Sequence, residues 1–235
     1  VELLNPRSGT IVIDGADVTK VPANKRGVGL VFQSYALFPH LSAFENVAFG
    51  LRLRKISNGE IKRRVGQSLE TVELGKFANR KPSELSGGQQ QRLSLARSLV
   101  LEPKVMLLDE PLSNLDARLR LDMRSELQRL QRNSGITMVF VTHDQGEALA
   151  LADRVVLMKD GLIEQMGTPA ELYNTPTTVF AADFMGFENI FEVHDGELNG
   201  NKGSIVSGYN AKSGFLAWRP SGVRVGTGPL TGTVA

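Results

Sequence analysis

The spacing of hydrophobic residues separates a strand-rich start from a helical stretch. Residues 10–13 end at the turn pair Asp14-Gly15, and residues 28–32 form a second short apolar run after a polar loop. Both runs have the length and the β-branched content of strands. Between 42 and 101 the apolar positions recur at helical intervals instead. The pattern therefore predicts strands first and a helical insert after them.

Two further apolar runs follow the helical stretch, at 104–108 and 137–141. Between them, apolar side chains recur at intervals of 4, 4 and 3 residues, as on one face of a helix. These positions are Leu119, Met123, Leu127 and Leu130. A strand, a helix and a strand of this size form a βαβ unit with parallel strands. The predicted fold class is therefore α/β.

The last third of the chain changes to short strands and turns. Residues 154–165 contain the turn Lys159-Asp-Gly161 and predict a hairpin, and short helices are predicted at 170–173 and near 179–184. Beyond 188, short apolar pieces alternate with Gly, Asn and Ser, as they do in small β domains. We therefore expect a domain boundary near 188.

Composition narrows the classes of function. The chain has 235 residues, 41% of them hydrophobic, which is enough for a sizeable core, and it has no cysteine. Thiol catalysis, disulfides and cysteine-bound zinc are therefore excluded within these residues. The apolar runs are far shorter than the ~20 residues that a membrane helix needs. The formal net charge is only +2 and there is no basic stripe, which argues against nucleic acid as a partner.

The first motif is Leu85-Ser86-Gly87-Gly88-Gln89, directly before a predicted helix. As structure alone, a serine with a glutamine three residues later is a capping box. As a binding motif, the two glycines let the backbone approach a ligand, and the free N–H groups of a helix start attract an anion such as phosphate. The residues by themselves leave both interpretations open.

The second motif is a pair of acids, Asp109 and Glu110, at the end of the run 104–108. Strand-end acids are often only solvated or capping, but ligands of parallel α/β sheets bind at the carboxyl ends of strands. Neighbours in an extended chain point to opposite sides, so we expect the two acids to have different roles. One can hold Mg²⁺ while the other polarises a water molecule.

Three more polar residues stand at the ends of elements. Gln33 follows the run 28–32, His143 follows the run 137–141, and Asp116 precedes the helix between the two later runs. Taken singly, a glutamine or a histidine at a strand end is an ordinary surface residue, and an aspartate before a helix is an N-cap. Their order along the chain carries more information than any one of them.

That order resembles the nucleotide-binding subunit of an ATP-binding cassette (ABC) transporter over nearly the whole chain. Gln33, Ser86, Asp109 and His143 follow the family's succession of Q-loop, signature, Walker B motif and switch histidine. Residues 113–116, Ser-Asn-Leu-Asp, lie where the family has its D-loop. The resemblance implies that the whole protein hydrolyses ATP with Mg²⁺.

The resemblance also implies a domain plan. It places a P-loop NTPase-like ABC ATPase core at 1–188, with a helical subdomain at about 35–101. Phe187-Glu-Asn-Ile190 and Ala217-Trp-Arg-Pro220 are similar to the start of the small β-barrel regulatory domain of some importers. We therefore expect the first part of an OB-like barrel at 189–235.

The family's roles can be carried over position by position. Gln33 would sense Mg²⁺ and the attacking water, Asp109 would support Mg²⁺, Glu110 would be the general base, and His143 would contact the γ-phosphate. The remaining positions would act across a homodimer interface on the nucleotide of the opposite subunit: Ser86, Gly87, Gly88, Gln89 and Asp116.

The segment after Gln33 resembles the importer branch that serves maltose, polyamines, sulfate and ferric iron. The similarity lies in 35–42 and in Glu45-Asn-Val47. It implies a peripheral position on the cytoplasmic face of the plasma membrane, with transmembrane permease subunits and, indirectly, a solute-binding protein as partners. The residues expected to contact the permease are Tyr35, Phe38, Pro39 and His40. Apolar residues here are equally consistent with a core, and the sequence does not choose the solute.

One departure from the family is large. The 235 residues contain no G-x-x-x-x-G-K-[ST], and so no phosphate-binding loop. The chain opens Val1-Glu-Leu-Leu4 and stops at Val234-Ala235, from which we expect that both ends are cut. We expect the chain as given to be inactive. The alternatives to an importer subunit are a soluble ABC ATPase without a transport role and a noncatalytic interaction module.

Overall fold

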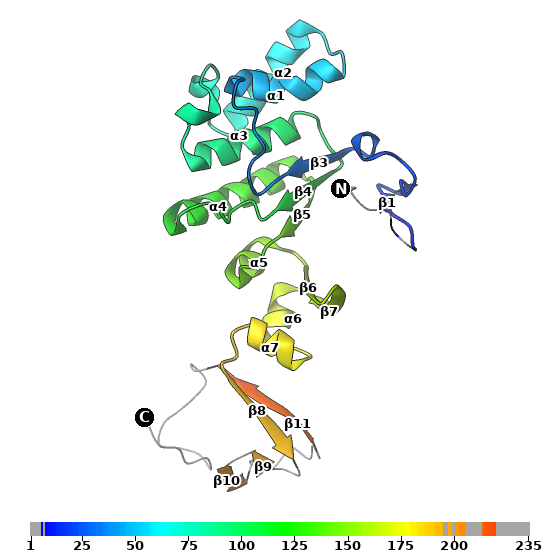
Figure 1. Ribbon diagram of the computed structural model, residues 1–235, viewed down its shortest axis with the longest axis vertical. Helices are drawn as coiled ribbons and strands as arrows, with labels where there is room; N and C mark the ends of the chain where they lie inside the picture. Colours follow the sequence, from blue (N-terminus) through cyan, green and yellow to red (C-terminus); the bar gives the residue numbers. More distant parts are fainter. Residues whose placement is uncertain (1–5, 7, 195–196, 199–200, 205–212, 220–235) are drawn as a thin grey trace. The chain divides into compact units, whose positions relative to one another are not determined.

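The computed structural model describes residue 6 and residues 8–194, 197–198, 201–204 and 213–219 (Figure 1). The chain divides into two compact units, Val1–Asp144 and Gln145–Ala235. Each unit is described by itself below. The domain boundary expected near 188 stays a prediction.

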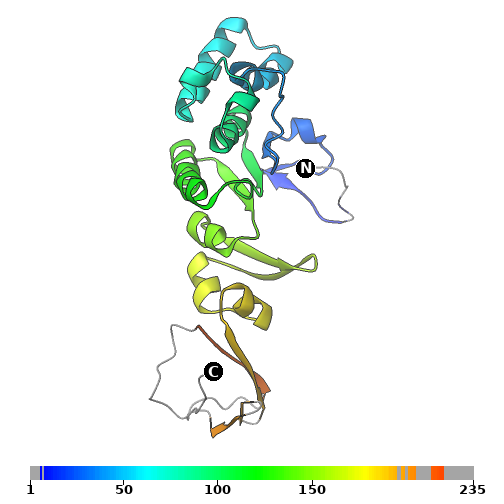
Figure 2. The ribbon, with the colours of Figure 1, turned by 60° about the vertical axis from the view of Figure 1, so that its left-hand side comes forward.

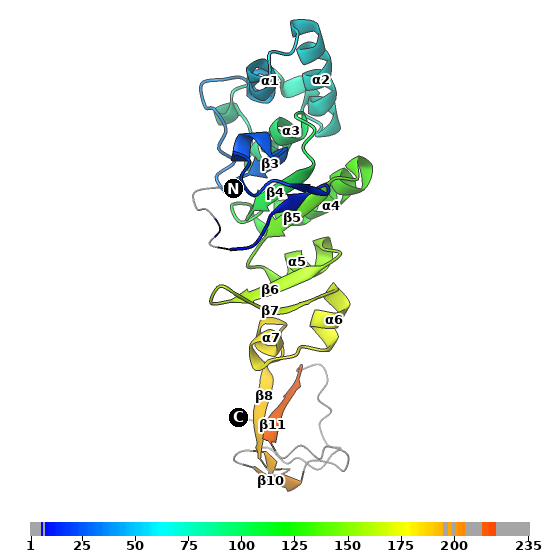
Figure 3. The same cartoon turned by 90° about the vertical axis from the view of Figure 1, so that its right-hand side faces the viewer.

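A parallel three-stranded sheet forms the centre of the first unit. Its strands are β3 (Val28–Val31), β4 (Val105–Asp109) and β5 (Thr137–Val141), in the order β3-β4-β5. Helix α4 (Ala117–Ser134) connects β4 to β5, as Figure 3 shows. The predicted strand-helix-strand unit with parallel strands is confirmed. The carboxyl ends of all three strands therefore lie at one edge of the sheet.

A short hairpin precedes this sheet. Strands β1 (Val12–Ile13) and β2 (Ala16–Asp17) pair antiparallel around Asp14 and Gly15, whose φ angles are 51° and 73°. Left-handed residues at both turn positions suit the twist of a two-residue hairpin, which is why Asp-Gly is favoured there. The turn was predicted, but the first strand is shorter than the run 10–13. A 3-10 helix follows at Ala23–Lys25.

The predicted helical insert is confirmed between β3 and β4. It comprises three helices and two 3-10 turns: α1 (Ala43–Leu53), α2 (Asn58–Thr71), Gly75–Phe77, Pro82–Glu84 and α3 (Gly87–Leu99). Each helix begins after a serine whose hydroxyl accepts a backbone N–H three residues later: Ser42, Ser57 and Ser86. The predicted apolar faces are buried, as Leu51, Val65 and Leu69 illustrate.

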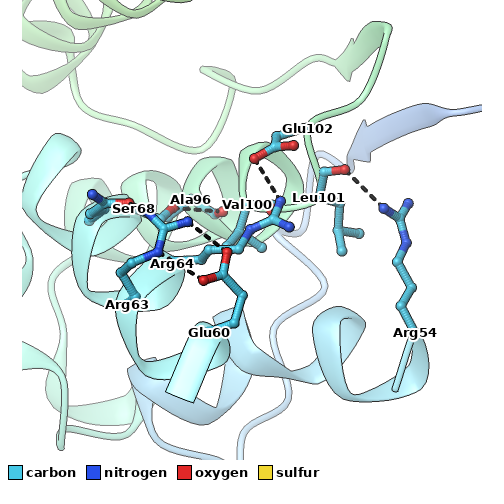
Figure 4. Close-up of polar contacts among 10 residues, drawn as sticks. Arg54, Glu60, Arg63, Arg64, Ser68, Ala96, Val100, Leu101 and Glu102 are labelled. Carbon is cyan, nitrogen blue, oxygen red and sulfur yellow. Dashed lines mark hydrogen bonds and ion pairs between the residues drawn. The ribbon is translucent and has the colours of Figure 1, made fainter. Parts of the chain in front are cut away.

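Side chains of α1 and α2 cap the C-terminal end of α3 (Figure 4). The bonds run from Arg54 Nη1 to Leu101 O (3.0 Å), from Arg64 Nη2 to Val100 O (2.7 Å) and from Ser68 Oγ to Ala96 O (3.1 Å). The carbonyls at and beyond the end of a helix lack partners within it, so the two arginines satisfy groups that otherwise need water, whereas Ser68 adds a second bond to Ala96 O, which also accepts the N–H of Val100. The insert thereby fixes the end of the helix whose first residues carry the Ser-Gly-Gly-Gln motif.

The second unit starts with α5 (Gln145–Leu151) and contains the predicted hairpin. Strands β6 (Val155–Lys159) and β7 (Leu162–Gly167) pair antiparallel, and two short helices follow, α6 (Pro169–Asn174) and α7 (Val179–Phe184). The hairpin strands and the helices α6 and α7 were predicted to within two residues at each end, whereas α5 was not predicted. Their core contains Val155, Leu157, Leu172, Ala181 and Met185.

An antiparallel sheet follows in the order β10-β9-β8-β11. Its strands are β8 (Asn189–His194), β9 (Glu197–Leu198), β10 (Asn201–Ser204) and β11 (Ser213–Trp218). Figure 2 shows β8 and β11 side by side, and their ladder pairs Asn189 with Trp218 at one end. The expected β-barrel stays a prediction, because much of 195–235 lies outside the described residues.

Arg219, which ends the Ala-Trp-Arg segment, fixes the end of β11. Its guanidinium carbon lies 3.5 Å from the ring centroid of Tyr173 and 4.0 Å from that of Phe187. It also donates a hydrogen bond to the carbonyl of Met185. Cation–π contacts and this bond therefore hold β11 against the α6–α7 region. In the described part of the chain, none of the helices is long and apolar enough to cross a membrane.

Candidate active site at the ends of three parallel strands

Three of the polar residues singled out from the sequence meet just beyond the sheet. Gln33 lies two residues after β3, Glu110 follows β4 directly, and His143 lies two residues after β5. Gln33 Nε2 donates to Glu110 Oε2 at 3.3 Å, and His143 Nδ1 lies 3.3 Å from the same oxygen. Adjacent strands therefore bring an amide, a carboxylate and an imidazole to one point.

The backbone turns sharply at Glu110. Its φ is 42°, a left-handed value that costs a non-glycine residue about 1–2 kcal/mol. Two bonds hold it there: Glu110 N donates to Val141 O at 3.0 Å, and Ser113 Oγ donates to Glu110 O at 2.9 Å. The expectation of an extended Asp109-Glu110 pair with alternating sides is therefore wrong at Glu110. The turn directs its carboxylate toward Gln33 and His143.

Ser113 and Asn114 position Gln33, which the sequence did not reveal. Gln33 Nε2 also donates to Ser113 Oγ at 3.1 Å, and Asn114 Nδ2 donates to the backbone oxygen of Gln33 at 2.8 Å. The only sequence signal was that both residues belong to the segment resembling a D-loop. With its amide nitrogen directed at two acceptors, Gln33 presents Oε1 as its remaining polar atom.

Asp109 is the last residue of β4 and directly precedes Glu110 in the sequence. The residue is exposed. Mg²⁺ in nucleotide sites is usually held by one or two carboxylates and by phosphate oxygens of the substrate. The Asp109 carboxylate and the Gln33 amide oxygen are hard oxygen ligands of this type, so the residues present fit the ion. Among the described residues, no group of three or more His, Asp and Glu could hold a metal ion by itself.

The predicted capping box at the start of α3 is confirmed. Gln89 N donates to Ser86 Oγ at 3.4 Å, and Ser86 N donates to Gln89 Oε1 at 2.9 Å. These two bonds satisfy two of the N–H groups that a helix start leaves free. The structural interpretation of this motif therefore holds, and its role across a dimer stays a prediction.

The two glycines of the motif have different surroundings. Gly88 is buried, and a Cβ there would lie 2.8 Å from Leu119 Cδ1 of α4. Gly87 is exposed, and a Cβ there would lie 3.6 Å from Leu115 Cδ2, an ordinary contact. Gly88 therefore lets α3 approach α4 closely, a function within the chain that the sequence did not indicate.

Asp116 is the N-cap of α4, as predicted. Its Oδ1 accepts the backbone N–H of Leu119 at 2.9 Å, and the residue is exposed. Since Asp116 is exposed, its second carboxylate oxygen can face a partner subunit. Its role toward the nucleotide of a second subunit stays a prediction.

Comparisons with known proteins decide the family. Residues 1–113 match the ABC transporter family. The Fe(3+) ions import ATP-binding protein of Brucella melitensis is 50% identical over 247 residues, a match that covers 99% of this chain and 70% of that protein. This chain belongs to the ABC transporter family. The resemblance inferred from the order of the motifs is therefore confirmed.

Two other relatives of this ABC protein show the extent of the match. The spermidine/putrescine import ATP-binding protein of Aliivibrio fischeri is 58% identical over 184 residues, 78% of this chain and 50% of that protein. The Fe(3+) ions import ATP-binding protein of Rhizobium etli is 50% identical over 233 residues, 95% of this chain and 66% of that protein. The chain thus spans about half the length of the polyamine relative.

The segment after Gln33 in this ABC protein is partly core and partly surface. Tyr35 is buried, and its hydroxyl has no hydrogen-bond partner among the described residues, whereas Pro39 and His40 are exposed. Phe38 is half-buried, and its ring centroid lies 4.6 Å from that of Phe49 on α1. The core interpretation therefore fits Tyr35, and the contact roles of all four residues expected to meet the permease stay predictions.

Exposed apolar side chains of α1 extend this surface. Phe49 is 40% exposed and Leu53, one helical turn later, is 71% exposed. The sequence reasoning missed both. The signal that could have found them is that they stand four residues apart, off the buried stripe of Val47 and Leu51.

Proposed function

We propose that this ABC protein is the ATP-binding and ATP-hydrolysing subunit of a solute importer. The observation that carries the proposal is the convergence of Gln33, Glu110 and His143 beyond three adjacent parallel strands. Phosphoryl transfer to water requires an oxygen ligand for the metal, a base for the water and a hydrogen-bond donor for the phosphate. In the proposal these are Gln33, Glu110 and His143, in that order. The relatives named above, which are import ATP-binding proteins, support the same reading.

Glu110 acts as the general base in this proposal. Its Oε2 already accepts hydrogen bonds, so the carboxylate is held in a fixed orientation while its other oxygen stays available to a water molecule. A positioned base removes the proton as the water attacks the terminal phosphorus. The left-handed backbone at Glu110 supports this role, because strained non-glycine residues gather at active sites.

His143 contacts the γ-phosphate through Nε2. Since Nδ1 faces Glu110, the ring has only Nε2 left for a ligand, and the side chain is 74% exposed. A ring nitrogen that carries a proton can donate a hydrogen bond to a phosphate oxygen, and Nε2 has this role in the proposal.

Asp109 and Gln33 Oε1 would hold Mg²⁺ together with phosphate oxygens of the substrate. When bound, the ion neutralises the charge that develops on the transferring phosphoryl group. Ser113 holds the side-chain amide of Gln33 for this task, and Asn114 holds its backbone. Loss of the Ser113 bond would weaken the hold on the amide, and loss of the Asn114 bond would loosen the backbone that carries it.

Two copies of the chain act together in the proposal. The exposed start of α3, with Ser86, Gly87 and Gln89, would face the nucleotide held by the other copy, and Asp116 would lie at the same interface. The first N–H groups of a helix favour anions. Gly88 would serve this site by letting α3 seat on α4.

The exposed surface formed by Phe38, His40, Phe49 and Leu53 would receive a permease subunit. Apolar and aromatic side chains that remain exposed are typical anchors of protein interfaces. The protein would then lie at the cytoplasmic face of the plasma membrane, bound through the permease and coupled through it to a solute-binding protein.

The experiment joins the chain, at its first residues, to a segment that carries a phosphate-binding loop of the form G-x-x-x-x-G-K-[ST]. The joined chain is expressed together with candidate permease subunits from the same source, and membrane association and ATP turnover are measured. The proposal expects both. Turnover without membrane association would favour a soluble ABC ATPase, and membrane association without turnover would favour a noncatalytic module.

A further inference from the structure

The backbone is left-handed at two consecutive residues between Gln33 and the exposed His40. Tyr35 has a φ of 62° and Ala36 a φ of 47°. Neither is glycine, and a Cβ makes this conformation unfavourable for an L residue. Such a turn persists only when neighbouring groups hold it. It begins two residues after the amide that faces Glu110.

Arg97, on α3, provides that hold. Its Nη1 donates to Ala36 O at 2.7 Å, and its Nη2 donates to Tyr35 O at 3.2 Å. Its guanidinium carbon also lies 5.4 Å from the ring centroid of Phe38. Ser94, one helical turn earlier, donates to Tyr35 O at 3.1 Å. One side chain thus binds both carbonyls of the strained pair and the aromatic ring that follows.

The surroundings of Arg97 explain why an arginine suits this place. The guanidinium is partly buried, and this desolvation lowers its pKa from the ordinary value. In the part of the chain that the structure describes, its polar contacts are the two carbonyls. A planar guanidinium can donate to two carbonyls and stack on a ring at once, whereas a lysine ammonium is a point donor.

Both ends of the turn are attached to other elements. On one side, Asn114 holds the backbone of Gln33. On the other, the buried Asn46 of α1 accepts the N–H of Phe38 at 2.8 Å and donates to its carbonyl at 3.1 Å. The chain between Gln33 and Phe38 is only four residues long. The backbone conformation of the turn therefore determines how Gln33 lies relative to Phe38.

We propose that Arg97 is a positioning residue: by holding Tyr35 and Ala36 left-handed, it fixes Gln33 against Glu110 and joins that amide to the Phe38 surface. The structural part stands on the contacts above. Its consequence for hydrolysis rests on the proposed function. Arg97 itself touches neither the nucleotide nor the reacting atoms in this account.

Hydrogen exchange of the 235-residue chain tests the structural part without any activity. The N–H of Tyr35 donates to Phe32 O at 2.9 Å, so its exchange reports on the turn. Arg97→Lys should speed exchange in 33–38 by about tenfold, the factor expected for losing a bond to a charged donor. Arg54→Lys is the matched control, because Arg54 also donates to a backbone carbonyl, that of Leu101 after the end of α3, and not to a carbonyl of the turn. It should leave 33–38 unchanged.

Ala36→Gly supplies the decisive second variant. Glycine adopts the left-handed conformation without a Cβ penalty, so adding it to Arg97→Lys should slow the exchange again. If Arg97→Lys does not fold, Ser94→Ala removes one bond to Tyr35 O and should speed exchange about threefold, with the same rescue by glycine. Exchange in 33–38 that matches the Arg54→Lys control, or that glycine does not slow, would overturn the proposal.

Kinetics of the chain joined to a phosphate loop test the consequence. Arg97→Lys should lower kcat about tenfold with KM for MgATP nearly unchanged, and Ala36→Gly should restore kcat. If kcat of the double variant with Arg97→Lys and Ala36→Gly is as low as that of Arg97→Lys alone, Arg97 does not act through the turn. If the unsubstituted joined chain hydrolyses no ATP, the proposed function fails, while the exchange result still decides the role of Arg97.

Discussion

The Nδ1 of His143 lies 3.3 Å from the Oε2 of Glu110, across the ends of β5 and β4. This pair joins the histidine and the acid that stand 33 residues apart in the sequence. The sheet register produces the contact, because Asp109 pairs with Val141, Glu110 follows Asp109 directly, and His143 lies two residues after Val141. The predictions below concern the chain joined to a phosphate loop unless stated otherwise.

Glu110→Gln should abolish most ATP turnover while nucleotide binding is retained. A glutamine can accept hydrogen bonds from Gln33 and His143 but cannot take a proton from water. Loss of a positioned base typically costs about 10²–10⁴ in rate. Phosphate release and equilibrium ATP binding are the two measurements. Near-normal turnover would assign the base to another group, with His143 the next candidate.

Ser113→Ala should lower kcat about tenfold without a comparable change in KM. The serine hydroxyl accepts from Gln33 Nε2 and donates to Glu110 O, so its removal takes away one of the two acceptors that hold the amide and loosens the turn at Glu110. Ser113→Thr, which keeps the hydroxyl, is the control and should retain most of the activity. If the alanine and threonine variants behave alike, the hydroxyl does not position Gln33.

Gly87→Asp should leave the monomer folded and prevent an ATP-dependent dimer. An acid in the first turn of α3 is favourable for the helix itself, but its charge would oppose the phosphates of a second copy. Gly87→Asn has nearly the same shape without the charge and should impair the dimer less. Sedimentation with MgATP measures the outcome. A dimer in the aspartate variant as stable as in the unsubstituted chain would contradict the role in trans.

Gly88 provides the contrast to Gly87. Gly88→Ala should reduce the free energy of unfolding by about 1 kcal/mol or more, because its Cβ would overlap Leu119. Gly87→Ala should cost much less. Urea denaturation of the 235-residue chain distinguishes them, and equal losses would mean that the close approach of α3 to α4 is not limited by Gly88.

Phe38→Ala together with His40→Ala should weaken association with the permease more than basal hydrolysis. His40 is exposed, and Phe38 packs on Phe49 and lies beside Arg97, so neither side chain touches the catalytic cluster directly. Copurification with the permease and basal ATP turnover are compared. Leu121→Ala, which shortens an exposed apolar side chain on α4, is the control and should change neither. A general loss of folding in the double variant would favour the core interpretation of this segment.

Periodicity predicted the elements well because it reflects local geometry. The helical face through Val65 and Leu69 and the strand 137–141 follow from spacing alone. The turn at Glu110 could not be predicted, since it depends on the bond from Glu110 N to Val141 O on a distant strand as well as on the local bond from Ser113. The candidate site was found through the order of its motifs, whereas the hydrogen bonds between its residues became visible only in the structure.

The role of Gly88 illustrates the same difference. Sequence reasoning explained the glycine pair by access of a ligand to the backbone. The structure adds a contact with Leu119, which is 31 residues away in the sequence and reaches Gly88 only because α4 lies beside α3. A glycine needed for packing and one needed for a ligand look alike until the neighbouring helix is known.

Phosphate release with saturating MgATP, measured for the 235-residue chain beside the same chain joined to a phosphate loop, tests the central claim most directly. Gln33, Asp109, Glu110 and His143 address the metal, the water and the terminal phosphate, while a phosphate loop supplies the donors that hold the triphosphate. We predict steady turnover for the joined chain and none above background for the 235-residue chain. Absence of turnover in the joined chain, or equal turnover in both, would contradict the account.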